Sequence, residues 1–459
     1  MPKLEIRPIS GFKEFLPEEQ IVLERMKKII VKHFELYGFT PIETAAVERE
    51  EALLAKAGEN TKLIYGLQLL ERADQAVGET GGLALHFDVT VPLARFVAQN
   101  YGKIAFPFRR YQIQKVWRGE RAQKGRFREF YQADIDVIGD GELGLLNDAE
   151  IPAVIYGLFS EMAIGPFQIR INNRRILSGL LEHMRIPLTY TPEGEMRGQS
   201  TLNIIDRASK IGMAEVKHML MSDAKISPLQ ADSLIEVLTK KGDTDHLVSW
   251  LTSRDYGALF AQGAAELQEV MQFVRALGVP EEACIVDLGI ARGLDYYTGT
   301  VYETMLLKNP EIGSICSGGR YDDLASHFID RKLPGVGISI GLTRLLFALI
   351  EGGIVKPASS SPSQAIVFQM DPILNADYFR LAAELRRAGI KTEVYPEAHK
   401  IEKQTKYALR KGIPFGIYLD EKRKAEEVCS VRDFCANNDV SIKLSELAPS
   451  LKKSGNFTA

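Results

Sequence analysis

The sequence predicts an α+β protein of two or three domains, and three observations support this fold class. Residues 40–138 alternate short β-like runs with turns, as the strands of an antiparallel sheet do. Residues 195–275 are instead helix-forming and contain leucine-rich and methionine-rich runs, which indicates an inserted helical subdomain. After residue 364, a strand-like run, a helical run and a second strand-like run follow one another, as in a βαβ unit. A chain of 459 residues is long enough for such a division.

The first predicted element is an amphipathic helix that begins near Pro17. Proline is favoured at the first position of a helix, and Glu18 and Glu19 follow in the first turn, where carboxylates interact favourably with the helix dipole. Apolar residues then recur at helical spacing as far as Tyr37. Gly38 is expected to end the helix.

Composition limits the class of protein. A formal net charge of −3 excludes a generally basic nucleic-acid-binding protein but allows a local basic patch. The four cysteines form no C-x-x-C pair, so neither a zinc site nor a disulfide framework is indicated, and we predict no metal ligands among the side chains. We recognise neither a signal peptide nor a membrane-spanning run, and expect a protein of the reducing cytoplasm with no membrane partner.

The stretch 118-RGERAQKGRFR-128 concentrates five cations and one acid between two strand-like runs. Reading 109–118 and 126–138 with a period of two places polar residues in one phase of each run and mostly apolar residues in the other. The two runs therefore predict an antiparallel hairpin with its loop at 119–125.

The polar face of this hairpin is graded along its length. Arginines stand at its entrance, whereas Gln132, Asp134 and Asp136 occupy the centre of the second strand. One interpretation is a sheet face that simply meets water. The alternative is a ligand site, for a molecule that is anionic at one end and cationic or hydrogen-bonding at the other.

Several blocks resemble one known family and occur in its order. The segment 116-VWRGERAQKGRFREFYQADIDVIG-139 resembles motif 2 of class II aminoacyl-tRNA synthetases, in the form found in histidine–tRNA ligases. The agreement extends to five further blocks, which are 84-ALHFDVTVPLARFVAQN-100, 292-RGLDYYTGTVYE-303, 313-GSICSGGRYDDL-324, 335-GVGISIGLTRL-345 and the C-terminal 400-KIEKQTKYALRKGIPF-415. The resemblance spans nearly the whole chain.

This resemblance implies a division into domains. The catalytic domain would be built on an antiparallel class II sheet in two parts, residues 1–194 and 276–352, separated by the helical insertion 195–275. Residues 353–363, which are mostly small residues and proline, would link it to a small α/β anticodon-binding domain at 364–459.

The resemblance also implies a reaction. Histidine and ATP would form histidyl-adenylate and pyrophosphate, with Mg²⁺ bridging phosphate oxygens, and the histidyl group would then pass to the cognate tRNA. Phosphoryl transfer of this kind depends on positioning and charge neutralisation, for which arginine is well suited. We expect a homodimer, although Ala45 stands where motif 1 of the family usually has proline.

By the same resemblance, Arg118 would bind the α-phosphate of ATP and Arg344 its far phosphates. Glu120 would hold the adenine side. Arg292 would act in catalysis together with Arg118, at the carboxylate of histidine and the α-phosphate. A structural salt bridge is the alternative role for Arg344, and Thr343 stands before it where the family often has glutamate.

For histidine itself, the resemblance implies two groups of residues. Asp88, Thr90 and Gln132 would bind the α-amino group. Asp136 and the pair Tyr296 and Tyr297 would face the imidazole, because a carboxylate paired with a ring nitrogen distinguishes histidine from an apolar isostere. Two alternatives stay open: Asp136 neutralises a buried arginine, and one of the two tyrosines belongs to the core.

Contacts with tRNA are expected in two places. Arg121 and Lys124 of the basic loop can reach nucleotide or the 3′ end of the tRNA. In the C-terminal domain, residues on one helical face would contact the anticodon arm, namely Lys403, Lys406, Tyr407 and Arg410. A solvated helix face is the alternative.

Two other classes of protein fit the sequence less well. A catalytically silent paralogue that binds histidine or tRNA would lack the C-terminal domain or have a degraded 292-RGLDYY-297 block, and this chain keeps both. A plain RNA-binding module needs no graded polar face. Neither class I motifs nor a P-loop occur.

Overall fold

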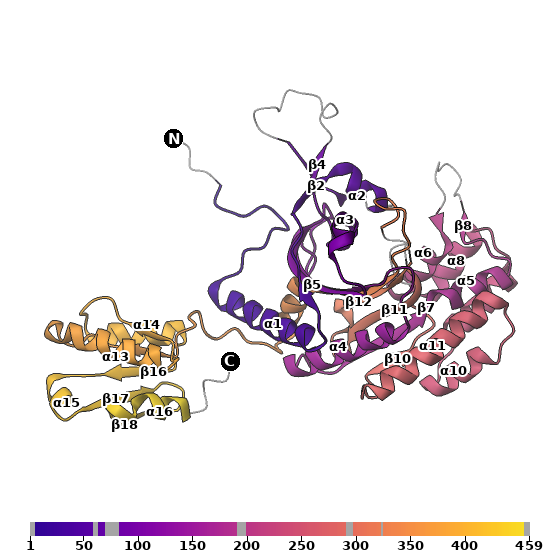
Figure 1. Cartoon of the computed structure of the whole chain (residues 1–459). Coiled ribbons are helices and arrows are strands. Elements are labelled where there is room, and N and C mark those ends of the chain that lie inside the picture. Colours follow the sequence, from indigo (N-terminus) through magenta and orange to yellow (C-terminus); the bar gives the residue numbers. More distant parts are fainter. Residues whose placement is uncertain are drawn as a thin grey trace. The chain divides into compact units, whose positions relative to one another are not determined.

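The computed structural model describes residues 5–57, 63–68, 82–190, 199–290, 297–322 and 325–453. The chain forms two compact units, Met1–Lys13 with Lys27–Ile354 and Glu14–Met26 with Val355–Ala459. Figure 1 shows the elements of both. The predicted opening helix is confirmed as α1 (Pro17–Leu36), and Gly38 follows it with a φ of +74°.

An eight-stranded sheet forms the centre of the first unit, in the order β1-β5-β6-β13-β12-β11-β7-β10. All its inner pairs are antiparallel, and only the outermost pairs β1–β5 and β7–β10 are parallel. The strands are β1 (Thr40–Pro41), β5 (Phe108–Trp117), β6 (Glu129–Ile138), β7 (Phe167–Asn173), β10 (Cys284–Val286), β11 (Tyr297–Leu306), β12 (Ser314–Tyr321) and β13 (Gly335–Gly341). The predicted antiparallel sheet and hairpin are thereby confirmed.

The hairpin differs from the prediction at its loop. Strand β6 begins at Glu129 rather than at Arg126, because Gln123 and Arg126 form an isolated bridge inside the loop. The Arg128 amide donates to the Gly11 carbonyl, 2.8 Å away, instead of to the hairpin partner. Arg126 and Arg128 therefore precede the strand and do not continue its polar face.

Helix α4 (Leu146–Met162) covers one face of the sheet, and a buried ion pair joins the helix to the sheet. Arg320 of β12 and Asp148 of α4 are 5% and 0% exposed, and Arg320 Nε lies 3.0 Å from Asp148 Oδ1. Tyr302 of β11 donates its hydroxyl to the Asp148 carbonyl at 2.8 Å. Helix α4 thus packs against this face and leaves the opposite face for the candidate site.

Helices surround this sheet, and small sheets flank it. The predicted helical stretch corresponds to α6 (Thr201–Asp206), α7 (Ala208–Ile211), α8 (Met213–Ser222), α9 (Pro228–Leu238), α10 (Thr244–Thr252) and α11 (Ala258–Ala276). The remaining elements of the unit are α2 (Glu50–Ala57), α3 (Thr90–Asn100), α5 (Arg174–His183), α12 (Leu342–Glu351), the sheet of β2 (Val47–Arg49), β3 (Gly66–Leu67) and β4 (Leu83–Leu85), and the pair β8 (Thr189–Tyr190) and β9 (Gln199–Ser200).

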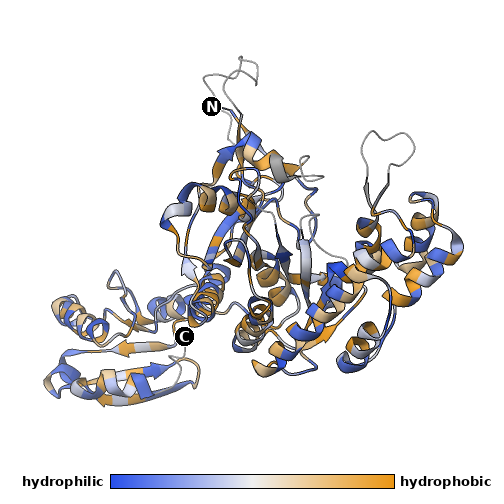
Figure 2. Ribbon diagram, turned by 45° about the vertical axis from the view of Figure 1, so that its right-hand side comes forward, coloured by the Kyte–Doolittle hydropathy of each residue, from blue (hydrophilic) through white to orange (hydrophobic). Residues whose placement is uncertain are grey.

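These helices are amphipathic. In α11 the buried residues recur at three- and four-residue intervals from Phe260 to Val274, which is the spacing of one helix face. Figure 2 shows the corresponding mixture of hydrophobic and hydrophilic residues along the helices. No helix in the part of the chain that the structure describes is long and apolar enough to cross a bilayer.

The second unit contains a five-stranded sheet in the order β15-β14-β16-β17-β18. The predicted βαβ unit is confirmed, since β14 (Ala365–Val367) and β15 (Thr392–Val394) pair in parallel on either side of α13 (Asn375–Arg387). The other elements are α14 (Ile401–Lys411), β16 (Phe415–Tyr418), α15 (Glu421–Ala425), β17 (Val428–Asp433), β18 (Asn438–Lys443) and α16 (Leu447–Lys453).

Serines of the predicted linker are fastened to this sheet through Glu393 of β15. Ser361 and Ser363 donate their hydroxyls to Glu393 Oε1 at 2.6 and 2.8 Å. Lys411 and Tyr407 of α14 reach the same carboxylate at 2.9 and 3.0 Å. Burial raises the pKa of Glu393, but these four hydrogen bonds together outweigh it and lower the pKa to about 2. Residues 361–363 therefore belong structurally to the second unit.

We expect Glu393→Gln to remove an acid-sensitive part of the stability of the second unit. A carboxyl whose folded pKa is lowered stabilises the fold above its unfolded pKa, and that stability is lost as the pH falls through the folded pKa. Calorimetry of the full chain should show a lower melting temperature for the variant at pH 7. The difference from the unsubstituted chain should vanish as the pH falls from about 4.5 toward about 2. A difference independent of pH would contradict this account.

Candidate functional site

The polar face predicted for the hairpin is buried, so the interpretation that it meets water is wrong. Gln132, Asp134 and Asp136 of β6 are 7%, 2% and 4% exposed. The antiparallel register places Arg110 opposite Asp136 and Gln112 opposite Asp134 on β5. On the other side, Gly337, Ser339 and Gly341 of β13 face the same three β6 residues. Buried polar groups cost stability unless they are paired, so this face needs partners.

Asp136 is held by two residues. Arg110, which is fully buried, forms an ion pair with Asp136 Oδ2, and the Tyr321 hydroxyl donates to Asp136 Oδ1 at 2.9 Å. Burial raises the pKa of Asp136 to about 6, opposed by the Arg110 charge and the Tyr321 hydrogen bond, while Asp88 raises it further. The alternative considered from the sequence, a carboxylate that pairs with a buried arginine, is therefore a real contact of this residue.

Asp134 is the second buried carboxyl of the face. Burial raises its pKa to about 7, against the Arg110 charge and a hydrogen bond from Ser339, and the Asp136 and Asp88 charges add to the rise. Its Oδ1 has no hydrogen-bond donor among the described residues. Gln132 donates from Nε2 to Ser339 Oγ at 2.6 Å, and its Oε1 is likewise without a donor there.

Asp88 contributes a third carboxylate from the segment before α3. Its Oδ1 accepts from the amides of Thr90 and Val91 at 3.2 and 3.0 Å, which caps the start of the helix. Its Oδ2 is buried and has no donor within the described ranges. Burial raises the pKa of Asp88, opposed by these amides and by the charges of Arg118 and His86. Thr90 therefore contacts Asp88 through its backbone.

Arg118 lies beside this carboxylate. Its Nε donates to the Phe87 carbonyl at 2.9 Å, and its guanidinium lies 5.2 Å from the centre of the Phe130 ring. Glu120 forms an ion pair with Arg126 Nε at 2.5 Å. The predicted phosphate-binding cation thus adjoins the buried carboxylates, and Glu120 belongs to the loop.

Arg344 stands on the first turn of α12, just after β13, and its Nη2 donates to the Ile312 carbonyl. The preceding Thr343 accepts a hydrogen bond from the Tyr131 amide at 2.9 Å, which fastens α12 to β6. Tyr297 begins β11 beside Tyr321 and packs in the same apolar cluster. Arg292 and Tyr296 lie outside the described residues.

Sequence reasoning missed three residues of this face. The period of two places Arg110 in the polar phase of the first strand, but the sequence alone assigns it no role, although the alternation that selects Asp136 also selects the residue opposite it. Tyr321 and Ser339 lie within recognised blocks, and no local pattern shows that they hydrogen-bond the aspartates and Gln132.

The residues expected to contact tRNA divide into two kinds. Arg121, Lys403, Lys406 and Arg410 are exposed, and Lys124 forms an exposed ion pair with Glu351 at 2.6 Å. Tyr407 is half-buried, because its hydroxyl binds Glu393 and its ring packs edge-on against Tyr395 at 5.2 Å. Its ring is therefore engaged within the second unit in this conformation.

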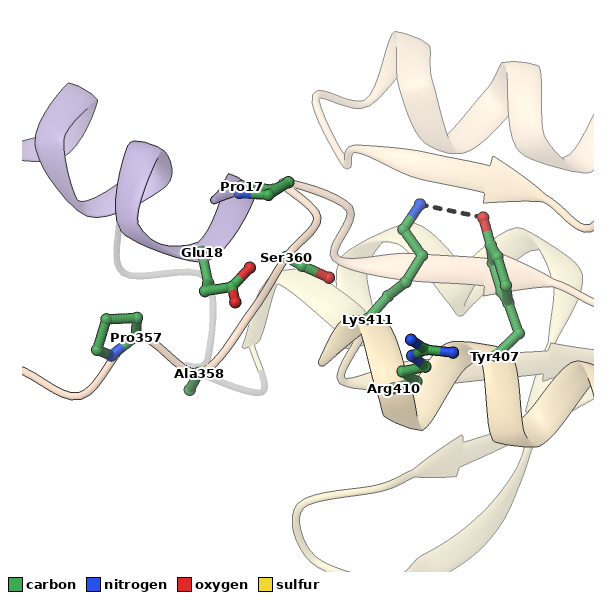
Figure 3. A pocket seen from close by; sticks show the side chains of 8 residues that line it. All are labelled: Pro17, Glu18, Pro357, Ala358, Ser360, Tyr407, Arg410 and Lys411. Carbon is green, nitrogen blue, oxygen red and sulfur yellow. Dashed lines mark hydrogen bonds between the residues drawn. The ribbon is translucent and has the colours of Figure 1, made fainter. Parts of the chain in front are cut away.

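A hollow of about 520 Å³ also lies in the second unit. Figure 3 shows Tyr407, Arg410 and Lys411 in its wall, with the Lys411 amine hydrogen-bonded to the Tyr407 hydroxyl at 3.0 Å. Its remaining lining residues are Pro17, Glu18, Pro357, Ala358 and Ser360. It contains none of the buried carboxylates and is a separate feature.

The described residues contain no group of three or more His, Cys, Asp and Glu side chains arranged to hold a metal ion. The sheet face instead offers buried acceptor oxygens that lack a donor among the described residues, on Asp88, Gln112, Gln132 and Asp134. The Arg118 guanidinium lies beside the first of these carboxylates. Such a site suits a ligand that donates several hydrogen bonds and carries positive charge at one end and negative charge at the other.

Known protein families match most of the chain. The family model described as histidyl-tRNA synthetase matches residues 11–345, and one described as anticodon binding domain matches residues 364–454. A histidine–tRNA ligase from Xylella fastidiosa (strain M23) is 44% identical, with 97% of each chain covered. One from Xanthomonas axonopodis pv. citri (strain 306) is also 44% identical, covering 97% of this chain and 95% of the relative.

Solved structures are similar as well. The crystal structure of histidyl-tRNA synthetase from Nostoc sp. PCC 7120 superposes with a TM-score of 0.88 at 40% identity, covering 98% of this chain and 100% of that chain. Apo histidyl-tRNA synthetase from S. aureus gives a TM-score of 0.65 at 20% identity, covering 98% and 100% of the two chains, and at that identity it supports the fold alone.

We expect Gly337→Ala to disturb the buried face. A Cβ at this position would lie 2.3 Å from Asp136 Oδ1 and 2.3 Å from the Ile135 carbonyl oxygen. Forced overpacking of this kind costs about 1–3 kcal/mol. Thermal denaturation should show the loss as a lower melting temperature.

Gly341→Ala is the matched control, because it lies on the same strand and its Cβ would meet nothing closer than Arg344 Cβ at 3.8 Å. The free energy of unfolding of that variant should lie within about 0.5 kcal/mol of the value for the unsubstituted chain. Equal melting of both variants would contradict the packing argument.

Proposed function

The chain belongs to the histidyl-tRNA synthetase family, and from that premise we propose that it attaches L-histidine to its cognate tRNA. As a member of this family it is an aminoacyl-tRNA synthetase, a ligase that uses ATP as a substrate. In the proposed reaction histidine and ATP form histidyl-adenylate and pyrophosphate. The histidyl group then passes to the tRNA and AMP is released.

One observation carries this proposal: on one sheet face of the first unit, three buried carboxyls, those of Asp88, Asp134 and Asp136, surround a single fully buried guanidinium, that of Arg110. Oxygens of Asp88, Gln132 and Asp134 lack donors among the described residues, and Asp136 presents a further carboxylate. Histidine supplies the missing donors, because its α-ammonium and the N–H of its imidazole both donate and the ammonium is cationic. A buried site built for hydrogen bonds rejects analogues that cannot form them.

We propose the following roles at the histidine end. Asp88, Thr90 and Gln132 bind the α-ammonium, which places it between two unpaired acceptor oxygens. Asp136, with Tyr296 and Tyr297, faces the imidazole. The position of Arg110 and Tyr321 on Asp136 supports this, because each occupies one carboxylate oxygen and leaves further lone pairs.

At the ATP end, we propose that Arg118 binds the α-phosphate, Arg344 the distal phosphates and Glu120 the adenine side. Arg292 acts with Arg118 on the charge that develops at the α-phosphorus. Mg²⁺ would be held chiefly by the phosphates, because proteins usually bind it through one or two carboxylates together with substrate phosphates and water.

We further propose that the protein acts as a homodimer in the cytoplasm and binds tRNA through two surfaces. The loop residues Arg121 and Lys124 would face the 3′ end. The exposed residues Lys403, Lys406 and Arg410 of α14, with Tyr407, would face the anticodon arm. Sedimentation at micromolar concentration tests the dimer.

The proposed activity predicts ATP–pyrophosphate exchange that depends on histidine and on no other amino acid. Arg292→Ala should lower the rate of this exchange by about 10²–10³-fold, the usual loss when a group that stabilises transition-state charge is removed. Each amino acid is supplied in turn with labelled pyrophosphate. Exchange with none of them would favour a catalytically silent paralogue, and near-normal exchange by Arg292→Ala would reject its role.

The proposed tRNA surface predicts that Lys403→Glu with Lys406→Glu weakens aminoacylation but leaves pyrophosphate exchange unchanged. Losing two phosphate contacts should make the salt dependence of tRNA binding shallower by about 0.7–0.9 per contact in log–log slope. Filter binding at several salt concentrations measures this slope.

A control double substitution, Arg387→Glu with Lys391→Glu, changes two other exposed cations of the same unit. The salt dependence of tRNA binding by this control variant should match that of the unsubstituted chain. Equal slopes for both double variants would remove α14 from the tRNA interface.

A further inference from the structure

Arg110 is a buried cation whose position packing alone does not explain. It lies on β5 directly opposite Asp136, its side chain is 0% exposed, and its Nη2 forms an ion pair with Asp136 Oδ2. Its Nε and Nη1 are buried and make no hydrogen bond to a described residue. Burying a guanidinium with so few partners is costly, and an apolar side chain of similar size would often be at least as stable there.

The charged groups around Asp136 make its protonation state depend on Arg110. Asp134 adjoins it on β6, Asp88 comes from the segment before α3, and Tyr321 of β12 donates to it, with Tyr297 of β11 beside that tyrosine. Arg118 and His86 act on Asp88 instead. Arg110 is the cation that lowers the pKa of both Asp134 and Asp136. Neighbouring carboxylates cannot all ionise without such a counter-charge.

We propose that Arg110 is a positioning residue that determines specificity in the histidine pocket, by keeping Asp136 ionised and fixing its orientation. This inference rests on the proposed function. Arg110 and Tyr321 hold one oxygen of Asp136 each, so the plane of the carboxylate is fixed from two strands. An ionised carboxylate only accepts hydrogen bonds, and its remaining lone pairs therefore require an N–H on the ligand ring. A protonated Asp136 carries a donor of its own, so it would no longer require an N–H on the ligand ring.

Arg110→Leu should weaken histidine binding in a manner that depends on pH. Loss of an adjacent cation raises the pKa of a carboxyl by about 1–3 units, so Asp136 of the variant is largely protonated at pH 7. We expect the KM for histidine in pyrophosphate exchange to rise about 10- to 100-fold at pH 7. It should fall again as the pH is raised toward about 9, where the carboxyl ionises, while the KM for ATP stays unchanged.

Two further variants separate charge from packing. Arg109→Leu removes the neighbouring arginine of the same strand, whose side chain points to the other face and pairs with Glu150 at 2.6 Å. Its KM for histidine should match the unsubstituted chain at every pH. Arg110→Lys keeps a cation and should keep the KM within a few-fold, with no added pH dependence. It also serves as the test if Arg110→Leu does not fold.

A histidine analogue with sulfur in place of the ring N–H, a thiazolylalanine, tests specificity directly. The unsubstituted chain should discriminate strongly against it, because Asp136 would face a sulfur atom with no proton to donate. In Arg110→Leu at pH 7 the ratio of kcat/KM for histidine over the analogue should fall about tenfold or more, since a protonated Asp136 no longer requires a ring N–H as its hydrogen-bond donor.

The outcomes of these measurements are distinct. A pH-dependent KM and reduced discrimination in Arg110→Leu, with rescue by lysine, support the proposal. A KM increase equal at all pH values, or an Arg110→Lys variant as impaired as Arg110→Leu, overturns it and leaves a purely structural role. Absence of histidine-dependent exchange in the unsubstituted chain would instead reject the proposed function.

Discussion

The candidate site of the first unit has more buried carboxyls than buried cations, and this imbalance determines its chemistry. Asp88, Asp134 and Asp136 lie near one another with one fully buried guanidinium, that of Arg110, among them. Burying an unpaired charge costs a fold much free energy. The proposed ligand is cationic and rich in hydrogen-bond donors, and it would offset this cost when bound. The raised pKa values of these carboxyls express the same imbalance in the unliganded chain.

The remainder of the sheet keeps this face rigid. Opposite it, the buried pair Arg320–Asp148 joins β12 to α4, and Tyr302 adds a hydrogen bond to the same aspartate. On the site face, Gly337 lacks the side chain that would collide with Asp136. A strand with a packed face on each side cannot shift its register without burying the wrong residues, so the carboxylates are held where the sheet places them.

In the second unit, a partly buried carboxylate with several hydrogen bonds fastens an irregular segment to the sheet. Glu393 gathers hydroxyls of the serine-rich segment and two side chains of α14, which ties a sequence without periodicity to the sheet. Helix α14 thereby presents two sides: Tyr407 and Lys411 point to this cluster, whereas Lys403, Lys406 and Arg410 remain exposed. The exposed cations are those that the proposed tRNA contact requires.

The sequence alone determined the alternation of the hairpin, the opening helix, the βαβ unit and, through co-ordered motifs, the family. These features are local in the chain, and periodicity and motif order report them directly. It did not determine that the polar face is buried, that Arg126 and Arg128 leave it, or that Arg110 and Tyr321 hold Asp136. The burial of the face and the Tyr321 hydrogen bond depend on β13 and β12, which come much later in the chain and extend the sheet beyond β6. The path of Arg126 and Arg128 depends on Gly11 and on the Gln123–Arg126 bridge, and the contact of Arg110 with Asp136 depends on the pairing of β5 with β6. Burial and pairing between distant strands are properties of the assembled sheet, and only the tertiary structure decides them.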